Sequence, residues 1–118
     1  MGWFTMAKHY KYEYRGNLAK LEGQKIEFEG LVSGVVLHKG HNYQNLIENV
    51  TVNGEQISEH MWTVLKFSTE TKKKRLIQAL KKNQNKRLKF IGKVSKYTYS
   101  YDKNKTNYFI DIRDIIEG

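Results

Sequence analysis

One stretch of the chain has the period of an amphipathic helix, while almost every other patterned stretch alternates as strands do. Within residues 72–83 the apolar side chains recur at helical spacing and form a single stripe: Leu76, Ile77, Ala79 and Leu80. The residues just before it include three that commonly cap a helix N-terminus: Ser68, Thr69 and Thr71. We therefore expect a β-rich chain whose one substantial helix lies within residues 70–84.

The first long strand is expected at residues 25–38, where apolar and polar residues alternate and later residues are apolar on both faces. Gly30 and Gly34 permit a sharp bend or bulge in this strand. A segment of alternating tyrosines precedes it, at Tyr10, Tyr12 and Tyr14, and predicts an extra strand or arm.

A second strand is expected at residues 45–52, and Asn53-Gly54 after it is a strong hairpin signal. A brief connection at residues 57–61 then leads to a third strand at residues 62–67.

After the helix, residues 87–101 predict a long fourth strand with one apolar face: Leu88, Phe90, Gly92 and Val94. Residues 102–106 predict a polar turn, and residues 107–116 predict the last strand. The order is three strands, a helix and two strands.

This order is typical of an OB-fold, a five-stranded, partly open Greek-key barrel with its helix between strands three and four. We expect one OB-fold-like domain over residues 8–118, after a flexible N-terminal extension at residues 1–7. Two alternatives are another small β-rich barrel and a sheet with one helix packed on it.

The composition bounds the class of protein. The chain has 118 residues, which suits one domain, and it has no cysteine, which excludes disulfides and thiol catalysis. It has no run of about 20 apolar residues that would span a membrane, and no secretory signal pattern. We expect a soluble, cytoplasmic protein that does not contact membranes, and the sequence leaves its oligomeric state open.

The net charge of +9 is concentrated in one segment. Residues 72–96 hold eleven cations and no Asp or Glu, whereas the rest of the chain has ten cations and twelve acids. Surfaces usually mix both signs. A long acid-free run therefore favours binding to a polyanion, and the alternative is a solvated basic surface.

Three segments carry recognisable motifs: residues 46–50 (LIENV), 59–62 (EHMW) and 88–97 (LKFIGKVSKY). They resemble motifs of small, uncharacterised OB-like proteins of phages and mobile genetic elements, and the resemblance spans residues 24–116. The family patterns are L-x-N-V, D-H-x-W and I-x-F-x-A-x-V-x-x-Y, so this chain departs at Glu59 and Gly92. The resemblance implies a phage or mobile-element setting and no particular activity.

Candidate catalytic and metal-binding residues are few. His38 and His41 lie three apart in a predicted loop and His60 is the next histidine, but metal sites need three or four ligands. No nucleophile–base order or paired-carboxylate pattern stands out. We therefore expect no metal, no cofactor and no catalysis. We expect His60 and Trp62 to be structural, with Trp62 in the core.

The binding hypothesis combines cations with tyrosines. Exposed aromatic rings stack on bases and cations contact phosphates. The expected nucleic-acid-binding residues are Lys39, Tyr43, Lys73, Lys74, Arg75, Arg87, Lys89, Lys93, Lys96, Tyr97, Tyr99, Tyr101, Lys103 and Lys105.

The expected partner is single-stranded DNA or RNA, or a protein with bound nucleic acid. The alternative function is a protein-interaction module, such as a phage inhibitor of a host defence nuclease of the anti-CRISPR type. For the tyrosines, the alternative is cross-strand packing in a long hairpin.

Overall fold

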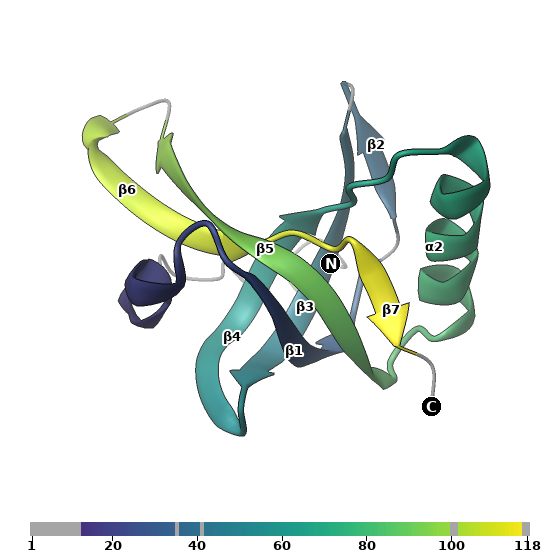
Figure 1. Ribbon diagram of the computed structural model, residues 1–118, viewed down its shortest axis with the longest axis horizontal. Coiled ribbons are helices and arrows are strands. Elements are labelled where there is room, and N and C mark those ends of the chain that lie inside the picture. The colour runs from purple at the N-terminus through teal and green to yellow at the C-terminus, as the bar shows by residue number, and fades with distance from the viewer. Residues whose placement is uncertain (1–12, 35, 41, 100–101, 117–118) are drawn as a thin grey trace, which may run out of the picture.

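The computed structural model describes residues 13–34, 36–40, 42–99 and 102–116. Over these residues the chain is mostly β, with a single α-helix, as the sequence predicts (Figure 1). The elements are η1 (a 3-10 helix, Gly16–Leu21), β1 (Lys25–Val32), β2 (Leu37–Lys39), β3 (Asn42–Val52), β4 (Glu55–Val64), α2 (Glu70–Lys82), β5 (Arg87–Tyr99), β6 (Asp102–Ile110) and β7 (Asp114–Ile116). The described part of the chain thus has seven strands, where the sequence predicts five. The expected extension at residues 1–7 lies outside the described residues.

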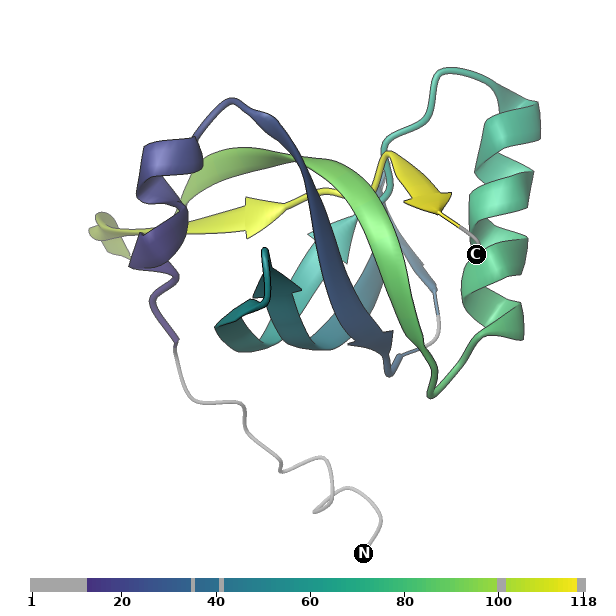
Figure 2. The ribbon, with the colours of Figure 1, turned by 60° about the horizontal axis from the view of Figure 1, so that its bottom comes forward.

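The strands form one sheet in the order β2-β3-β1-β5-β6, with β4 added beside β3 and β7 beside β5. All paired strands are antiparallel. An isolated parallel bridge joins Leu65 and Ile112, just beyond the ends of β4 and β6. Figures 1 and 2 show α2 on one side of the molecule, and η1 and the β5–β6 hairpin on the other.

The predicted strand over residues 25–38 is two separate strands, β1 and β2. A register shift lies between Glu29 and Leu31, so the bulge expected at Gly30 is confirmed. A Cβ at Gly30 would lie 2.2 Å from Ile47 Cγ2, which explains why glycine is needed in this close crossing. Gly34 lies in the link between the strands, where its carbonyl accepts hydrogen bonds from the side chains of Asn45 and Gln84.

The prediction of a connection at residues 57–61 is wrong, because β4 begins at Glu55 and pairs with β3 directly. The physical reason is the turn itself. Asn53 (φ 52°) and Gly54 (φ 82°) both adopt positive φ, as a two-residue hairpin turn requires. The chain therefore returns at once, and the third strand ends at Val64 rather than at Phe67.

Helix α2 begins at Glu70, after Thr69, whose hydroxyl accepts a hydrogen bond from the Lys72 amide at 3.1 Å. Of the three capping candidates, Thr69 is thus the N-cap. The helix buries Leu76, Ala79 and Leu80, which confirms the predicted apolar stripe. The last turn is closed by side chains, since Asn83 Nδ2 donates to the Ala79 carbonyl and Gln84 Nε2 donates to the Leu80 carbonyl.

The last predicted strand is also corrected. β6 begins at Asp102, where a turn over residues 102–106 was expected, and the chain leaves the ladder after Ile110 before forming β7. Buried Asp111 explains this break: its carboxylate accepts hydrogen bonds from the Lys93 amide and from the Arg113 guanidinium. These contacts turn the backbone away from the ladder that β6 makes with β5.

The alternating-tyrosine segment is only partly described, because Tyr10 and Tyr12 lie outside the described residues. Residues 13–15 are not part of a strand, and Tyr14 is 56% exposed. Instead, Arg15 leads into η1, which covers one end of the core with Leu18. At the centre of the core the rings of Phe28 and Phe90 stack with centroids 5.0 Å apart.

Candidate nucleic-acid interface

The predicted binding residues lie in three clusters. The first joins α2 to β2 and β3 and contains Tyr43, Lys73, Lys74 and Arg75. The second lies at the start of β5 and contains Arg87 and Lys89. The third is the β5–β6 hairpin, with Lys96, Tyr97, Tyr99, Lys103 and Lys105. Lys93 lies on β5 between the second and third clusters.

Two members of the sequence-based set are not placed. Tyr101 lies outside the described residues. Lys39 is the last residue of β2 and pairs with Asn42, but its side chain is outside the described part of the structure.

In the first cluster, Lys73 is already paired. Its Nζ lies 2.8 Å from the Glu70 carboxylate, and this hydrogen bond raises the pKa of Lys73 and lowers the pKa of Glu70. Arg75 faces Asp114 at 3.4 Å, whereas Lys74 is exposed. Glu70 also puts an acid in the first turn of α2, where the helix dipole favours a negative charge.

Tyr43 is part of a packed aromatic group. The His38 ring stacks on it at 4.4 Å, Phe67 meets it edge-on at 5.9 Å, and Lys73 Nζ lies 5.4 Å from its centroid. These contacts tie β2 and β3 to the start of α2. A base could stack on Tyr43 only by displacing one of these neighbours.

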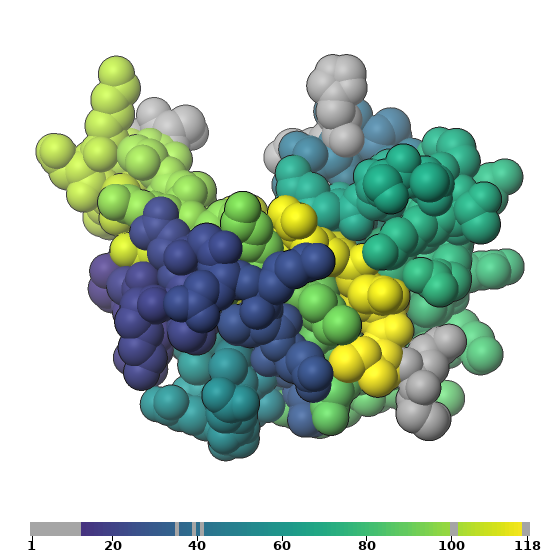
Figure 3. Space-filling view, in the orientation of Figure 1, coloured from purple at the N-terminus to yellow at the C-terminus, as the bar shows by residue number. Residues whose placement is uncertain are grey.

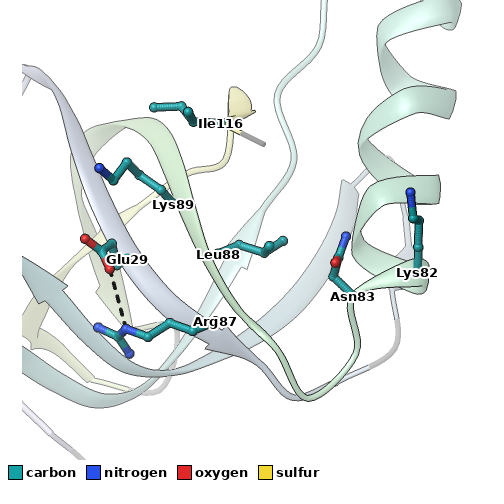
Figure 4. Close-up of a pocket in the computed structure, with 7 residues that line it drawn as sticks. All are labelled: Glu29, Lys82, Asn83, Arg87, Leu88, Lys89 and Ile116. Carbon is teal, nitrogen blue, oxygen red and sulfur yellow. Dashed lines mark ion pairs between the residues drawn. The ribbon is translucent and has the colours of Figure 1, made fainter. Parts of the chain in front are cut away.

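The second cluster lines a groove of about 630 Å³ between the end of α2, the start of β5 and β7 (Figure 4). Three cations and one carboxylate line it, together with an amide and two apolar side chains: Lys82, Arg87, Lys89, Glu29, Asn83, Leu88 and Ile116. The groove therefore carries an excess of two positive charges. Lys82 is a groove cation that was absent from the sequence-based set.

Arg87 is held in place, whereas the two lysines of the groove are not. Its guanidinium donates to the Asn49 carbonyl at 2.8 Å and to Thr51 Oγ1 at 2.7 Å, and its Nε lies 3.6 Å from Glu29. Lys82 and Lys89 are exposed. An anion entering the groove would thus meet one fixed cation and two adjustable ones.

In the third cluster, Tyr97 and Tyr99 belong to a hydrogen-bonded network. The Tyr97 hydroxyl lies 3.2 Å from the Tyr99 hydroxyl and accepts a hydrogen bond from Arg15 at 3.2 Å. Burial and the hydrogen bond with Tyr99 raise the pKa of Tyr97 to about 12. The ring of Tyr97 also packs edge-on against Phe109 at 5.7 Å. Both tyrosines therefore help to hold the hairpin.

Buried Arg15 is the centre of this network, and sequence reasoning missed it. Its Nε donates to the Tyr108 carbonyl at 2.6 Å and its guanidinium also contacts the His60 carbonyl at 3.4 Å. Its backbone amide donates to Asn107. The local sequence around Arg15 contains no pattern that would indicate its contacts, because the contacted residues lie far away along the chain. Arg15 thus connects β4 to the β5–β6 hairpin.

The expectation that Trp62 lies in the core is wrong. Trp62 is 46% exposed, while Met61, Thr63 and Leu65 on either side of it are buried. Strand alternation is the reason: with Met61 and Thr63 facing inward, Trp62 must face outward. Alternation shows that Trp62 and Met61 face opposite ways, but only the packing of β4 on the core shows which of them is inside.

His60 has the contacts of a structural residue. Its Nδ1 lies 3.8 Å from the Glu13 carboxylate, and burial lowers its pKa. Its backbone carbonyl accepts hydrogen bonds from Arg15 and Ser58.

The clusters have a definite arrangement in space. In Figure 3 the tip of the β5–β6 hairpin stands away from the body of the molecule, and a hollow separates it from the part formed by β2 and α2. The groove at the start of β5 lies elsewhere, beside the end of α2 (Figure 4). The structure thus does not unite the sequence-based set into one pocket.

In the part of the chain that the structure describes, no three His, Asp or Glu side chains are grouped as a metal site. Within the same residues no helix is long and apolar enough to cross a membrane. No protein-family profile and no curated protein matches the sequence. The resemblance to phage and mobile-element proteins therefore stays a prediction.

Proposed function

We propose that the protein is a non-catalytic module that binds single-stranded nucleic acid through its basic segment. The observation that carries this proposal is the groove at the start of β5, where Lys82, Arg87 and Lys89 face one carboxylate, Glu29. Its three cations all belong to residues 72–96, the segment that holds eleven cations and no acids. Phosphate contacts by Lys and Arg supply most of the affinity in non-specific nucleic-acid binding.

The proposal includes an OB-like arrangement, in which β1, β3, β4, β5 and β6 correspond to the five strands. The parallel bridge between Leu65 and Ile112 supports it, together with the hydrogen bonds from the Lys66 amide to the Ile112 carbonyl (2.8 Å) and from the Ile112 amide to the Val64 carbonyl (2.9 Å). These contacts bring the end of β4 beside the end of β6, as closure of a Greek-key barrel requires. Helix α2 follows β4 and precedes β5.

An OB-fold binds oligonucleotides on the face of its second and third strands and on two flanking loops. In this chain the corresponding parts are β3 and β4, the β1–β3 connection and the β5–β6 hairpin. The exposed cations of that hairpin, Lys96, Lys103 and Lys105, are suited to contact phosphates there. The groove beside α2 would be a second phosphate-binding surface on the same strand, β5.

Binding without catalysis is what the groove residues favour. Its one carboxylate is paired with Arg87, and the other charged groups are cations. General acid–base chemistry needs a group that can exchange a proton with a reacting atom beside it. The one carboxylate that lines the groove is instead paired with Arg87.

The test is fluorescence anisotropy with labelled single strands of DNA and RNA across a salt series. Each neutralised phosphate contributes about −0.7 to the slope of log affinity against log salt. We expect a slope of about −2 to −3.5, from three to five phosphate contacts. Lys82→Gln and Lys89→Gln should each make the slope shallower by about 0.7.

The matched control is Lys20→Gln, which removes an exposed lysine of η1 outside the basic segment and should leave the slope unchanged. Affinity weaker than about 100 μM at low salt, below ordinary non-specific binding, would refute the proposal. That result would favour the protein-interaction alternative.

A further inference from the structure

Trp62 presents a large apolar ring to solvent from the middle of a strand. It is 46% exposed, although it lies in β4, between the buried residues Met61 and Thr63. Single exposed apolar residues are common on protein surfaces. A half-exposed tryptophan leaves more apolar surface in water than most, because its ring is so large. The fold does not need a tryptophan at this position, because the inward-facing residues of β4 already pack in the core.

The neighbours of Trp62 on the sheet follow from the register of β3 and β4. Its cross-strand partner on β3 is Leu46, which is only 8% exposed, and Val64 and His60 are its neighbours two residues away along β4. Leu46 in turn packs against the backbone near Gly34, where an added Cβ would lie 3.2 Å from Leu46 Cβ. Leu46 is thus covered, whereas nearly half of the Trp62 residue surface is open to solvent.

The same strand is tied to the tyrosine pair of the β5–β6 hairpin. The His60 carbonyl and the Tyr97 hydroxyl both accept hydrogen bonds from buried Arg15. Trp62 is two residues from His60, which is about 7 Å along a strand. The exposed tryptophan therefore lies close to the base of the cationic hairpin.

We propose that Trp62 is a stacking platform for one unpaired base of the bound strand. This inference rests on the proposed function. It adds that the exposed face of β4 contacts a base of the nucleic acid. A base offers its flat face only when it is unpaired or unstacked, since a duplex covers both faces of each base. Trp62 thus selects single strands over duplexes.

The local charge agrees with a base rather than a phosphate at this position. Glu48 is the cross-strand partner of His60 and lies on the same sheet face as Trp62, according to the register of β3 and β4. A carboxylate there disfavours a phosphate group beside it. The backbone of the strand would instead follow the exposed cations of the hairpin, with the base directed toward the indole.

The test uses tryptophan fluorescence as a direct reporter. The chain has two tryptophans, so Trp3→Phe leaves Trp62 as the only one. Titration of this variant with oligothymidylate should quench its emission, and a duplex of the same length should not. Trp62→Ala should weaken single-strand binding by about 5- to 150-fold, the equivalent of 1–3 kcal/mol for one stacked base. Its salt slope should not change, because stacking releases no counterion.

Two further variants keep the result interpretable. Trp62→Phe retains a ring and should recover most of the affinity, and urea unfolding of each variant checks that the fold is intact. Tyr14→Ala removes an exposed (56%) aromatic side chain that precedes η1 and lies outside the proposed binding parts, and it should leave affinity unchanged.

The outcomes separate this inference from the proposed function. Salt-dependent binding that is unaffected by Trp62→Ala, with no quenching, would overturn the stacking platform and leave the proposed function standing. The absence of binding in the unaltered protein would overturn both. Loss of self-association in Trp62→Ala, measured by sedimentation, without loss of strand binding would show that a second copy of the chain covers this face, and would also overturn the inference.

Discussion

Substitution of Gly92 by alanine should strongly destabilise the protein. Gly92 lies in β5, where the chain that leaves β6 crosses it closely. A Cβ at this position would lie 1.7 Å from the Asp111 carbonyl oxygen and 2.8 Å from its carbonyl carbon. An ordinary non-bonded contact needs about 3.5 Å, so the backbone at Asp111 would have to move by roughly 1.5–2 Å.

That movement is opposed by hydrogen bonds on both sides of Gly92. The Asp111 amide donates to the Lys93 carbonyl at 3.2 Å, the Lys93 amide donates to Asp111 Oδ1 at 2.8 Å, and the Arg113 amide donates to the Ile91 carbonyl at 2.8 Å. Each has a net value of about 1 kcal/mol, and overpacking adds about 1–3 kcal/mol. We expect Gly92→Ala to lower the free energy of unfolding by about 4–6 kcal/mol.

The assay is urea unfolding followed by circular dichroism. Gly34→Ala is the matched control, because its Cβ would meet a side-chain atom, Leu46 Cβ, at 3.2 Å rather than a backbone oxygen. It should cost less than about 1 kcal/mol. A loss below about 1 kcal/mol for Gly92→Ala would refute the close crossing of β5 and residue 111.

Two other predictions concern the helix cap and the tyrosine network. Thr69→Ala removes the N-cap of α2 and should cost about 1 kcal/mol in urea unfolding, whereas the exposed Thr71→Ala should not; equal costs would contradict the assigned cap. The pKa of Tyr97 is raised from 10.0 to about 12 in the folded state, so the stability that this shift contributes is complete below pH 10 and is lost as the pH rises to about 12. Absorbance titration of tyrosinate should show one late-titrating group that Tyr97→Phe removes, and an unchanged titration curve would contradict the network.

The sequence by itself determined those elements that depend only on residues close together in the chain. The apolar stripe of α2 and its Thr69 cap depend on residues within one or two turns of each other. The stripe is as predicted, and the cap is one of the three predicted candidates. The same holds for the hairpin at Asn53-Gly54, because only the backbone freedom of those two residues is needed. The charge of the basic segment is likewise a property of the sequence alone.

The tertiary structure decided what depends on contacts far apart in the chain. Alternation showed that Trp62 and Met61 face opposite sides of a strand, but only the packing of β4 on the core shows which side is inside. Arg15 and Tyr97 are 82 residues apart in the sequence. Their hydrogen bond forms because contacts with β4 and β6 hold Arg15 beside the β5–β6 hairpin. The tertiary structure likewise decided that the cations lie in two separate places, the groove beside α2 and the β5–β6 hairpin. The alternation of residues along a strand shows which side chains share a face. Which residues that face contacts depends on how the strands pair and cross, and this is decided only when the whole chain folds.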